Sequence, residues 1–343
     1  GHLKSSNSTY LDKDFEEKKK IFNDFSGYQK YFQKIGTILD HDKRKAFIKK
    51  EIEKVLKKKN LNIVENENLL DEVTNLVDEP NILDCSFDRK FLTIPTEILI
   101  LTMQSHQKYF PLFTKKNEIT NEFIVVANKK DKEGLIKIGN ERVVRARLDD
   151  ANFFWNKDKS QNLVKKVSEL KKMNFFKGLG TYFDKVQRMR KLAAIISDEL
   201  LISKEKVELS ATICKTDLIS EIVGEFPELQ GIMGGHLSSA QGFDKEISNA
   251  IKEQYMPSGL NSNVSKKPYS ITLSLADRVD TLVGFFGINE KPSSSKDPYA
   301  LRRVALGIVK IIVENKKDFK INDIISYSSN FFLNQNFKFY NEK

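Results

Sequence analysis

The sequence predicts a mostly α-helical protein, in which an N-terminal α+β module precedes a mainly α-helical domain. Apolar residues recur at helical spacing along most of the chain, whereas residues 81–128 carry short apolar runs divided by turn signals. At 343 residues the chain exceeds the usual domain size of about 100–200 residues, so two or three domains are expected. The predicted divisions are a basic helical segment over 1–60, the α+β module over 61–155, an all-α domain over 156–300, and the start of a following helical region over 301–343.

Composition and charge restrict the function. The chain is 40% hydrophobic and has 24 Phe, which excludes a fully disordered chain. A formal net charge of +10 favours an anionic partner such as nucleic acid, although a lysine-rich composition can also reflect an A/T-biased genome. No apolar run reaches the roughly 18–20 residues of a membrane span, and no signal-peptide pattern is present. Cys85 and Cys214 give neither a disulfide framework nor a zinc motif, so a cytosolic protein is expected.

Helical signals begin near the N-terminus. Ser26 is placed to cap a helix over Gly27–Ile35, and Asp40 to cap a longer one over His41–Lys59. The polar face of the second helix is rich in lysine, which is typical of a solvated face and also compatible with a binding face. A third helix is predicted over Glu67–Val77.

Residues 81–128 predict strands, with one helix among them. Strands are expected at Ile82–Phe87 and Phe91–Ile94, and a hairpin is expected to join Gln107–Phe113 to Glu122–Asn128. Proline suits the first turn of a helix, which favours a helix over Pro95–Ser105.

Helical periodicity dominates after residue 128. The glycine-containing stretches Lys177–Thr181 and Gly234–His236 are interpreted as turns. The predicted helices are Leu135–Leu148, Leu163–Met173, Phe183–Leu201, Lys206–Val223, Asp244–Gln254, Ile271–Phe285 and Asp297–Glu314.

No GxxxxGK[ST], GxGxxG, HExxH or CxxC motif is present. One group of carboxylates, Asp217, Glu221 and Glu225, has the spacing i, i+4, i+8 and would share a helix face. Like charges at that spacing repel by a few tenths of a kcal/mol per pair, so a cation should face them. One candidate is a divalent metal. The other is an arginine from the later helices: Arg278, Arg302 or Arg303.

Residues 102–111, TMQSHQKYFP, place His106 and Lys108 beside Tyr109 and Phe110. Aromatic rings beside hydrogen-bond donors and a positive charge suit unpaired RNA. The alternative is a core strand with a polar start.

Three of the chain's ten arginines, Arg142, Arg145 and Arg147, lie within six residues. The guanidinium is a planar fork that suits phosphate or carboxylate. These arginines are therefore candidate phosphate contacts, while pairing with the following Asp149-Asp150 is an equal alternative.

Lys296-Asp297-Pro298 is predicted to begin the last helix, with Asp297 as N-cap and Pro298 at the first helical position. Exposed first-turn amides, together with Lys296 and Arg302, would suit a phosphate. Arg303 is the last of the contact candidates.

Together these segments resemble the β subunit of the bacterial heterotetrameric (α2β2) glycyl-tRNA synthetase. The stretches that carry the resemblance are TMQSHQKYFP at 102–111, ARLDDANFFWNKD at 146–158, KGLGTYFDKVQRMR at 177–190, KTDLISEIVGEFPELQGIMG at 215–234, SLADRVDTLVGFFGI at 274–288 and SSKDPYALRRVALGIVKII at 294–312. The resemblance is weakest in residues 1–60 and after about residue 315.

The resemblance implies a tRNA-binding, non-catalytic subunit of a cytoplasmic glycine–tRNA ligase. In that family the α subunit uses ATP, Mg²⁺ and glycine, so this chain is expected to bind no cofactor itself. The implied partners are the α subunit and tRNA(Gly), without membrane or DNA. Because the family's β chain has further modules at both ends, and this chain begins Gly1-His2, we expect a central fragment.

The resemblance also implies that residues 156–300 form an HD-superfamily domain. Active members coordinate metal through histidines, a His-Asp pair and a later Asp; here the pair falls on Thr216-Asp217 and the later Asp on Asp277. Because the imidazole is replaced, too few donors remain and no metal is expected. The alternatives are a metal-dependent HD-type phosphohydrolase, and a scaffold that docks the α subunit without contacting RNA.

Overall fold

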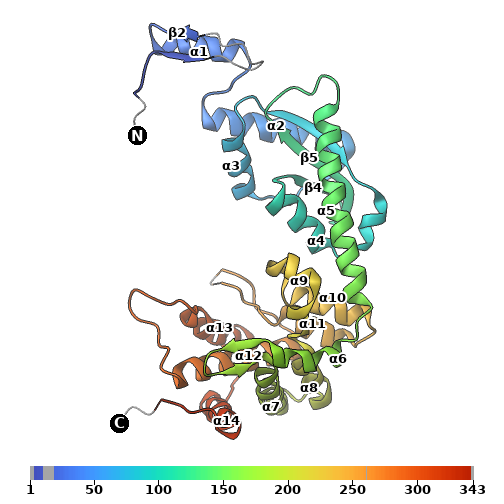
Figure 1. Ribbon diagram of the computed structural model, residues 1–343, viewed down its shortest axis with the longest axis vertical. Helices are drawn as coiled ribbons and strands as arrows, with labels where there is room; N and C mark the ends of the chain where they lie inside the picture. Colours follow the sequence, from blue (N-terminus) through green and yellow to red (C-terminus); the bar gives the residue numbers. More distant parts are fainter. Residues whose placement is uncertain (1–3, 11–18, 260, 341–343) are drawn as a thin grey trace. The chain divides into compact units, whose positions relative to one another are not determined.

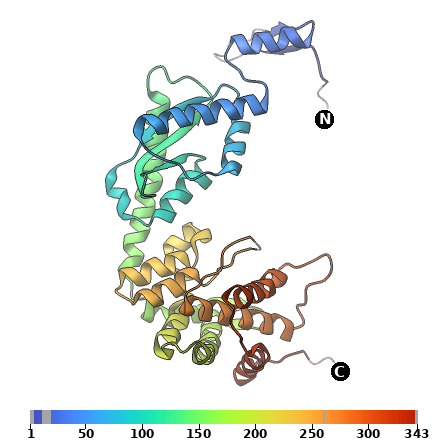
Figure 2. The same ribbon diagram turned by 180° about the vertical axis from the view of Figure 1, so that it is seen from behind.

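The computed structural model describes residues 4–10, 19–259 and 261–340, and its helices outnumber its short strands, which confirms the mostly α prediction. The chain forms two compact units, residues 1–152 (unit 1) and 153–343 (unit 2) (Figures 1 and 2). The division falls inside helix α5 (Leu135–Lys159), which extends well beyond its predicted end at Leu148. In the described part of the chain, no helix combines the length and the apolar character needed to cross a membrane.

Unit 1 starts with a two-stranded sheet, β1 (Ser8–Tyr10) and β2 (Lys19–Ile21), followed by α1 (Phe25–Lys34). The predicted cap is wrong by two residues: Asp24, not Ser26, caps α1 and accepts a hydrogen bond from the Gly27 amide at 2.6 Å. Asp24 has the extended backbone that a capping residue needs, whereas Ser26 already lies inside the helix.

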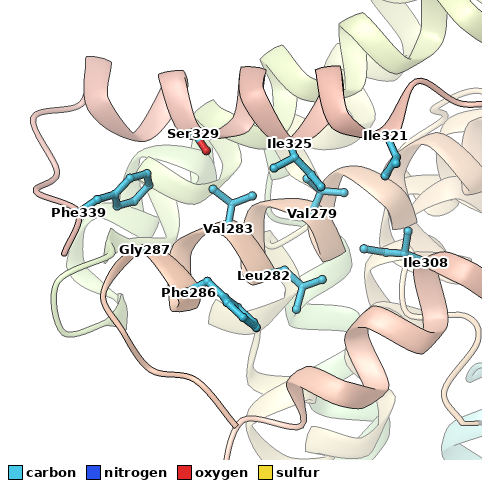
Figure 3. A pocket seen from close by; sticks show the side chains of 10 residues that line it. All are labelled: Val279, Leu282, Val283, Phe286, Gly287, Ile308, Ile321, Ile325, Ser329 and Phe339. Carbon is cyan, nitrogen blue, oxygen red and sulfur yellow. The ribbon is translucent and has the colours of Figure 1, made fainter. Parts of the chain in front are cut away.

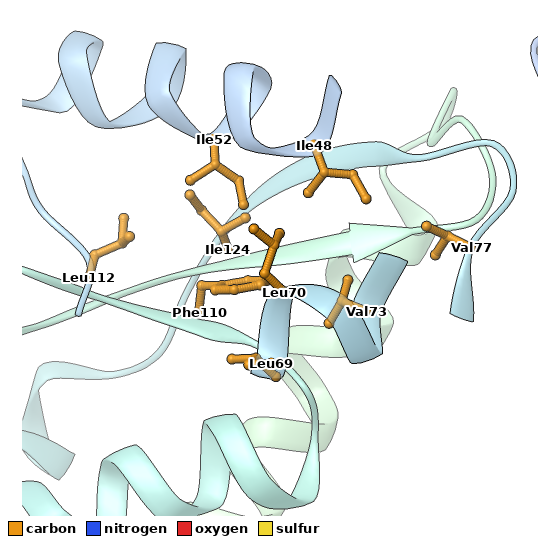
Figure 4. Packing of buried hydrophobic residues seen from close by; sticks show 9 residues of the cluster. All are labelled: Ile48, Ile52, Leu69, Leu70, Val73, Val77, Phe110, Leu112 and Ile124. Carbon is orange, nitrogen blue, oxygen red and sulfur yellow. The ribbon is translucent and has the colours of Figure 1, made fainter. Parts of the chain in front are cut away.

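The main sheet of unit 1 is antiparallel, with strand order β3-β5-β4. Helices α2 (His41–Lys59) and α3 (Glu67–Leu76) pack on it, and Asp40 caps α2 as predicted. The strands are β3 (Asn81–Ser86), β4 (Phe110–Phe113) and β5 (Ile119–Ala127). Figure 4 shows buried apolar residues of the resulting core: Ile48, Ile52, Leu69, Leu70, Val73, Val77, Phe110, Leu112 and Ile124.

Two predictions in unit 1 need correction. The expected strand Phe91–Ile94 is a 3₁₀ helix, η1 (Arg89–Thr93), because the Asp88 side chain accepts from the Lys90 amide and turns the chain. The expected helix Pro95–Ser105 is α4 (Thr96–Leu101) continued by a π-helical turn, η2 (Thr102–His106).

Unit 2 is built around two long helices, α7 (Tyr182–Leu200) and α12 (Pro268–Gly287), which pack against each other. A capping box between Thr181 and Asp184 begins α7. The remaining elements are α6 (Leu163–Lys166), η3 (Val167–Lys172), β6 (Asn174–Phe176), β7 (Gly180–Thr181), α8 (Lys204–Ile213), η4 (Thr216–Ile219), α9 (Glu221–Glu225), η5 (Pro227–Leu229), α10 (Ile232–Ala240), α11 (Lys245–Glu253), α13 (Leu301–Asn315) and α14 (Ile321–Asn334).

Two predictions about glycine-containing segments of unit 2 differ from the structure. Gly234–His236 lies inside α10 rather than in a turn, because a Cβ on Gly235 would come 2.5 Å from Lys252 Cβ; glycine there lets α10 and α11 pack closely. Lys177–Thr181 is a turn as expected, but it closes the β6–β7 hairpin instead of joining helices.

The C-terminal end of unit 2 packs back on α12. The Tyr340 amide donates to the Gly287 carbonyl at 2.6 Å, and a Cβ on Gly287 would meet the Phe339 ring at 2.3 Å. An apolar pocket of about 410 Å³ lies between α12, α13 and α14 beside this ring (Figure 3).

Candidate functional site

Six charged side chains are buried together in unit 2, and we call them the buried charge cluster. Each is at most 8% exposed. They lie on α7, on α12 and at the start of η4: Lys185, Arg188, Lys215, Asp217, Asp277 and Asp280. A buried charge is unfavourable unless it is paired, and here three cations face three carboxylates.

Asp277 lies between two lysines. Lys185 Nζ is 2.9 Å from its Oδ1 and Lys215 Nζ is 2.9 Å from its Oδ2. Burial by itself would raise the pKa of Asp277, but the two ammonium groups outweigh it and hold that pKa well below its usual range. Asp277 is therefore ionised, and its charge is already compensated from within the chain.

Asp280 forms the second centre of the cluster. Arg188 binds it through two nitrogens, with Nε at 2.7 Å from Oδ1 and Nη2 at 3.2 Å from Oδ2, while Lys185 Nζ is 3.1 Å from Oδ2. The guanidinium also stacks on the Phe332 ring and donates to Gln335 at 2.8 Å. These contacts connect α7, α12 and the end of α14.

Asp217 instead holds the start of α10. Its Oδ2 accepts from the Gly231 amide at 2.5 Å and from the Gly234 amide at 3.2 Å. Gly231 has φ +80°, and a Cβ on Gly234 would lie 3.0 Å from Oδ2, so glycine is needed at both places. Burial raises the pKa of Asp217 to about 6, although the Gly231 amide and Lys215 oppose that rise. Its Oδ1 has no hydrogen-bond partner in the described chain.

The donors at this centre do not fit a divalent metal. Thr216 stands where the resemblance places an imidazole, and it donates its hydroxyl to the Ile213 carbonyl at 2.7 Å. Both oxygens of Asp277 face ammonium groups. Within the ranges that the structure describes, no three His, Cys, Asp or Glu side chains are grouped to hold a metal ion. The lysines supply the positive charge that a cation would otherwise bring.

The predicted carboxylate stripe is wrong. The expected helix Lys206–Val223 is broken, since α8 ends at Ile213 and the chain then forms η4 and α9. Asp217 points to α10, while Glu221 pairs with Lys157. The arginines offered as partners contact other groups: Arg278 donates to the carbonyls of Tyr255 and Pro257, and Arg302 to that of Ser293.

The segment 102–111 contributes polar groups but no stacking surface. His106 is exposed on η2, and Lys108, which has φ +60°, pairs with Glu72 at 2.9 Å. Tyr109 and Phe110 are 7% and 3% exposed. The expectation that these two aromatic rings stack on RNA is therefore wrong, because both rings belong to the core of unit 1.

The arginines of α5 lie on its exposed side, while Val144 and Leu148 are buried. Asp149 pairs with Lys90 at 3.2 Å rather than with an arginine. Arg142 and Arg145 form no ion pair or hydrogen bond within the described chain, whereas Arg147 has a partner. Their role as phosphate contacts stays a prediction.

The cap of the last helix contradicts the phosphate site that was predicted at its start. Helix α13 begins at Leu301, and the Asp297 carboxylate accepts from the amides of Leu301 at 2.8 Å and Arg302 at 3.0 Å. These first-turn amides are thus occupied, and Pro298 lies outside the helix. Lys296 is exposed in the preceding loop, and Arg303 lines a cleft on α13.

The three cations of the buried charge cluster are absent from the sequence-based candidates. Lys185 and Arg188 stand beside apolar residues of the predicted helix Phe183–Leu201, and Asp277 and Asp280 stand beside apolar residues of the predicted helix Ile271–Phe285. The sequence signal that could have identified these residues is a charged side chain on the buried, apolar face of an amphipathic helix.

A protein family described as glycyl-tRNA synthetase beta subunit matches residues 1–342. The chain is 42% identical to the "Glycine--tRNA ligase beta subunit" of Janthinobacterium sp. (strain Marseille) over 268 residues, 78% of this chain and 38% of the relative. It is 37% and 39% identical to the proteins of that name from Thermodesulfovibrio yellowstonii and Rickettsia felis, over 96% of this chain and 49% of each relative. It thus spans about two-fifths to one-half of these relatives.

Proposed function

The chain belongs to the glycyl-tRNA synthetase beta subunit family, and on this premise we propose that it is a tRNA-binding, non-catalytic part of a cytoplasmic glycine–tRNA ligase. A separate α subunit carries the site for ATP, Mg²⁺ and glycine, and this chain binds no cofactor. It holds tRNA(Gly) and helps to present the 3′ end to that site. Orienting one reactant is a sufficient contribution, because positioning can lower a barrier by about 7–11 kcal/mol.

The pair Arg142 and Arg145 carries the RNA-binding part of the proposal. Both side chains are exposed on one side of α5 and have no carboxylate partner among the described residues. Residues three apart on a helix are neighbours, so their guanidinium groups can contact the same stretch of RNA backbone. The net charge of +10 attracts RNA to the chain from a distance.

The buried charge cluster supports the non-catalytic part. We propose that residues 156–300 form an HD-like scaffold whose metal positions, Thr216-Asp217 and Asp277, are degenerate. The Thr216 hydroxyl is already bonded to a carbonyl and the Asp277 carboxylate is compensated by two lysines, so neither is available as a metal ligand. This favours a scaffold over a metal-dependent phosphohydrolase.

The test is the salt dependence of tRNA(Gly) binding by the 343-residue chain. Each phosphate contact contributes about −0.7 to −0.9 to the log–log slope, so Arg142→Ala with Arg145→Ala should weaken binding and flatten the slope by about 1.5. Arg89→Ala, an exposed arginine of the same unit, is the matched control and should change neither. A double variant that binds like the unaltered chain would reject these two contacts.

Docking to the α subunit without RNA contact is the second candidate. It is favoured by apolar side chains left exposed on α13, where Val309 is 56% and Val313 is 66% exposed. If the chain captures the α subunit but shows no tRNA binding at low salt, docking replaces the first proposal.

A further inference from the structure

A cleft of about 570 Å³ opens in unit 2 beside α13. One wall is the loop that follows α11, and the other is the helix itself. The described residues that line it are Pro257, Ser258, Gly259, Asn261, Ser262, Arg303, Leu306, Gly307 and Lys310. Its volume is within the range of about 300–1,000 Å³ that small-ligand pockets usually have.

Arg278 of α12 lies directly behind this cleft. Its Nη2 donates to the carbonyls of Pro257 at 2.8 Å and Tyr255 at 3.0 Å, and its Nε to Ser274 at 3.2 Å. The side chain is only 9% exposed, yet it has no ion pair with a carboxylate of the described chain, and its Nη1 has no acceptor there. A buried guanidinium that no carboxylate contacts is unusual, because a buried charge is normally paired; the charge of Asp277 acts on Arg278 only without contact.

Gly307 brings α13 against this guanidinium. A Cβ at that position would lie 2.7 Å from Arg278 Nη1, so only glycine allows the approach. Gly307 and Pro257 both line the cleft and both contact Arg278, one on each wall. The uncompensated charge therefore acts across a thin layer of protein, where screening is weaker than in water.

Two further cations lie on the cleft wall itself. Arg303 is exposed and makes no hydrogen bond or ion pair with any residue that the structure describes. Lys310 donates to the Ser262 carbonyl at 2.7 Å, lies 3.5 Å from Glu314 and has a further contact within the chain. Arg278, Arg303 and Lys310 thus bring positive charge to a cleft that also offers hydroxyl and amide donors.

We propose that this cleft binds a phosphate group, and that the phosphate belongs to the RNA of the proposed function, on which this part of the inference rests. Arg303 provides a planar fork for two phosphate oxygens, and Lys310 adds a point charge that its own contacts hold at the cleft wall. Ser258 and Asn261 can donate to the remaining oxygens. The bound anion supplies the counter charge that Arg278 lacks.

The first experiment tests the cleft without RNA. Inorganic phosphate, compared with chloride at equal ionic strength, should raise the melting temperature of the unaltered chain. Arg303→Ala with Lys310→Ala should remove that shift, and Arg303→Lys with the native Lys310 should retain part of it. Arg190→Ala, at an arginine elsewhere in unit 2 whose side chain is 42% exposed, is the control and should keep the full shift. An equal shift in all variants would overturn the phosphate site.

The second experiment identifies the source of the phosphate. The double variant Arg303→Ala with Lys310→Ala should bind tRNA(Gly) several-fold more weakly and show a salt slope flatter by about 1.5, while Arg190→Ala binds normally. If phosphate raises the melting temperature of the unaltered chain, but the double variant binds tRNA with unchanged affinity, the RNA assignment is overturned. The ligand is then a free phosphate compound. If the unaltered chain binds no tRNA, the proposed function fails, and the first experiment still decides the cleft.

Discussion

Two lysines, one in each unit, have the same local arrangement and very different surroundings. Lys59 in unit 1 bridges Asp84 and Glu122, and its side chain is 26% exposed. Lys185 in unit 2 bridges Asp277 and Asp280, and its side chain is 2% exposed. A pair near water is screened and contributes about 0–1 kcal/mol, whereas a buried charge depends fully on its partners.

The two units differ in the same way as these two lysines. Among the described residues of unit 1 no charged side chain is buried, its core is mainly apolar and its ion pairs lie at the surface (Figure 4). Unit 2 places a charge cluster between α7 and α12 and keeps its apolar contacts around it, including those lining the pocket of Figure 3. Buried ion pairs contribute little net stability, so we interpret the cluster as fixing which residues of α7 and α12 face each other.

The largest effect expected is from Lys185→Met. It leaves Asp277 and Asp280 with one cation each in a buried site, and should lower the free energy of unfolding of unit 2 by about 3–5 kcal/mol. Trp155 is the only tryptophan and lies in unit 2, so its fluorescence during denaturation with urea reports on this unit. Lys59→Met is the matched control and should cost about 0–1 kcal/mol in unit 1. Equal losses of unfolding free energy in Lys185→Met and Lys59→Met would contradict the distinction between the two lysines.

The second expectation concerns Asp217, whose pKa is raised to about 6 from an ordinary 3.8. The folded state then holds this proton more tightly than the unfolded state, so unit 2 loses stability as the pH rises from about 4 to about 6. Asp217→Asn removes the titration. Its stability relative to the unaltered chain should therefore grow by about 2–3 kcal/mol between pH 4 and pH 7, at 1.36 kcal/mol per pKa unit.

Urea denaturation followed by Trp155 fluorescence at several pH values measures that difference. Asp198→Asn, at an exposed carboxylate of unit 2, should give a difference that does not depend on pH. A difference for Asp217→Asn that stays constant from pH 4 to pH 7 would show that the carboxylate is not perturbed in this way.

The smallest effect expected is in the apolar core of unit 1. Ile48 is fully buried on α2, and Ile48→Val removes one methylene, which should cost about 0.5–1.5 kcal/mol at any pH from 4 to 7. Circular dichroism during urea denaturation, with the Trp155 transition of unit 2 unchanged, measures it. If Ile48→Val lowers the free energy of unfolding as much as Lys185→Met does, unit 1 tolerates substitution of a buried residue no better than unit 2.

Much of the fold could be predicted from local signals. Asp40 caps α2 where its position before an amphipathic run predicts it, and the hairpin of β4 and β5 lies where two apolar runs flank a polar loop. Such features depend on residues a few positions apart, and their spacing is visible in the sequence. The six stretches that resemble the synthetase subunit were likewise sufficient for the family, which residues 1–342 confirm.

Functional residues were predicted less well, because their partners are distant in sequence. Whether Tyr109 stacks on RNA or on Phe123 depends on how β4 pairs with β5, and the rings are 5.4 Å apart in the core. The phosphate site expected at the start of the last helix has a local competitor, since the Asp297 carboxylate already accepts from the Leu301 amide.

The sequence alone therefore determined the family, most helices and the positive charge, because composition and periodicity are properties of the chain itself. Only the tertiary structure decided which charges are paired. Lys185 meets Asp280 across 95 residues, and Arg278 lies behind Arg303 and Lys310 because Gly307 admits it. Burial sets the strength of each interaction, and burial exists only once the helices have packed.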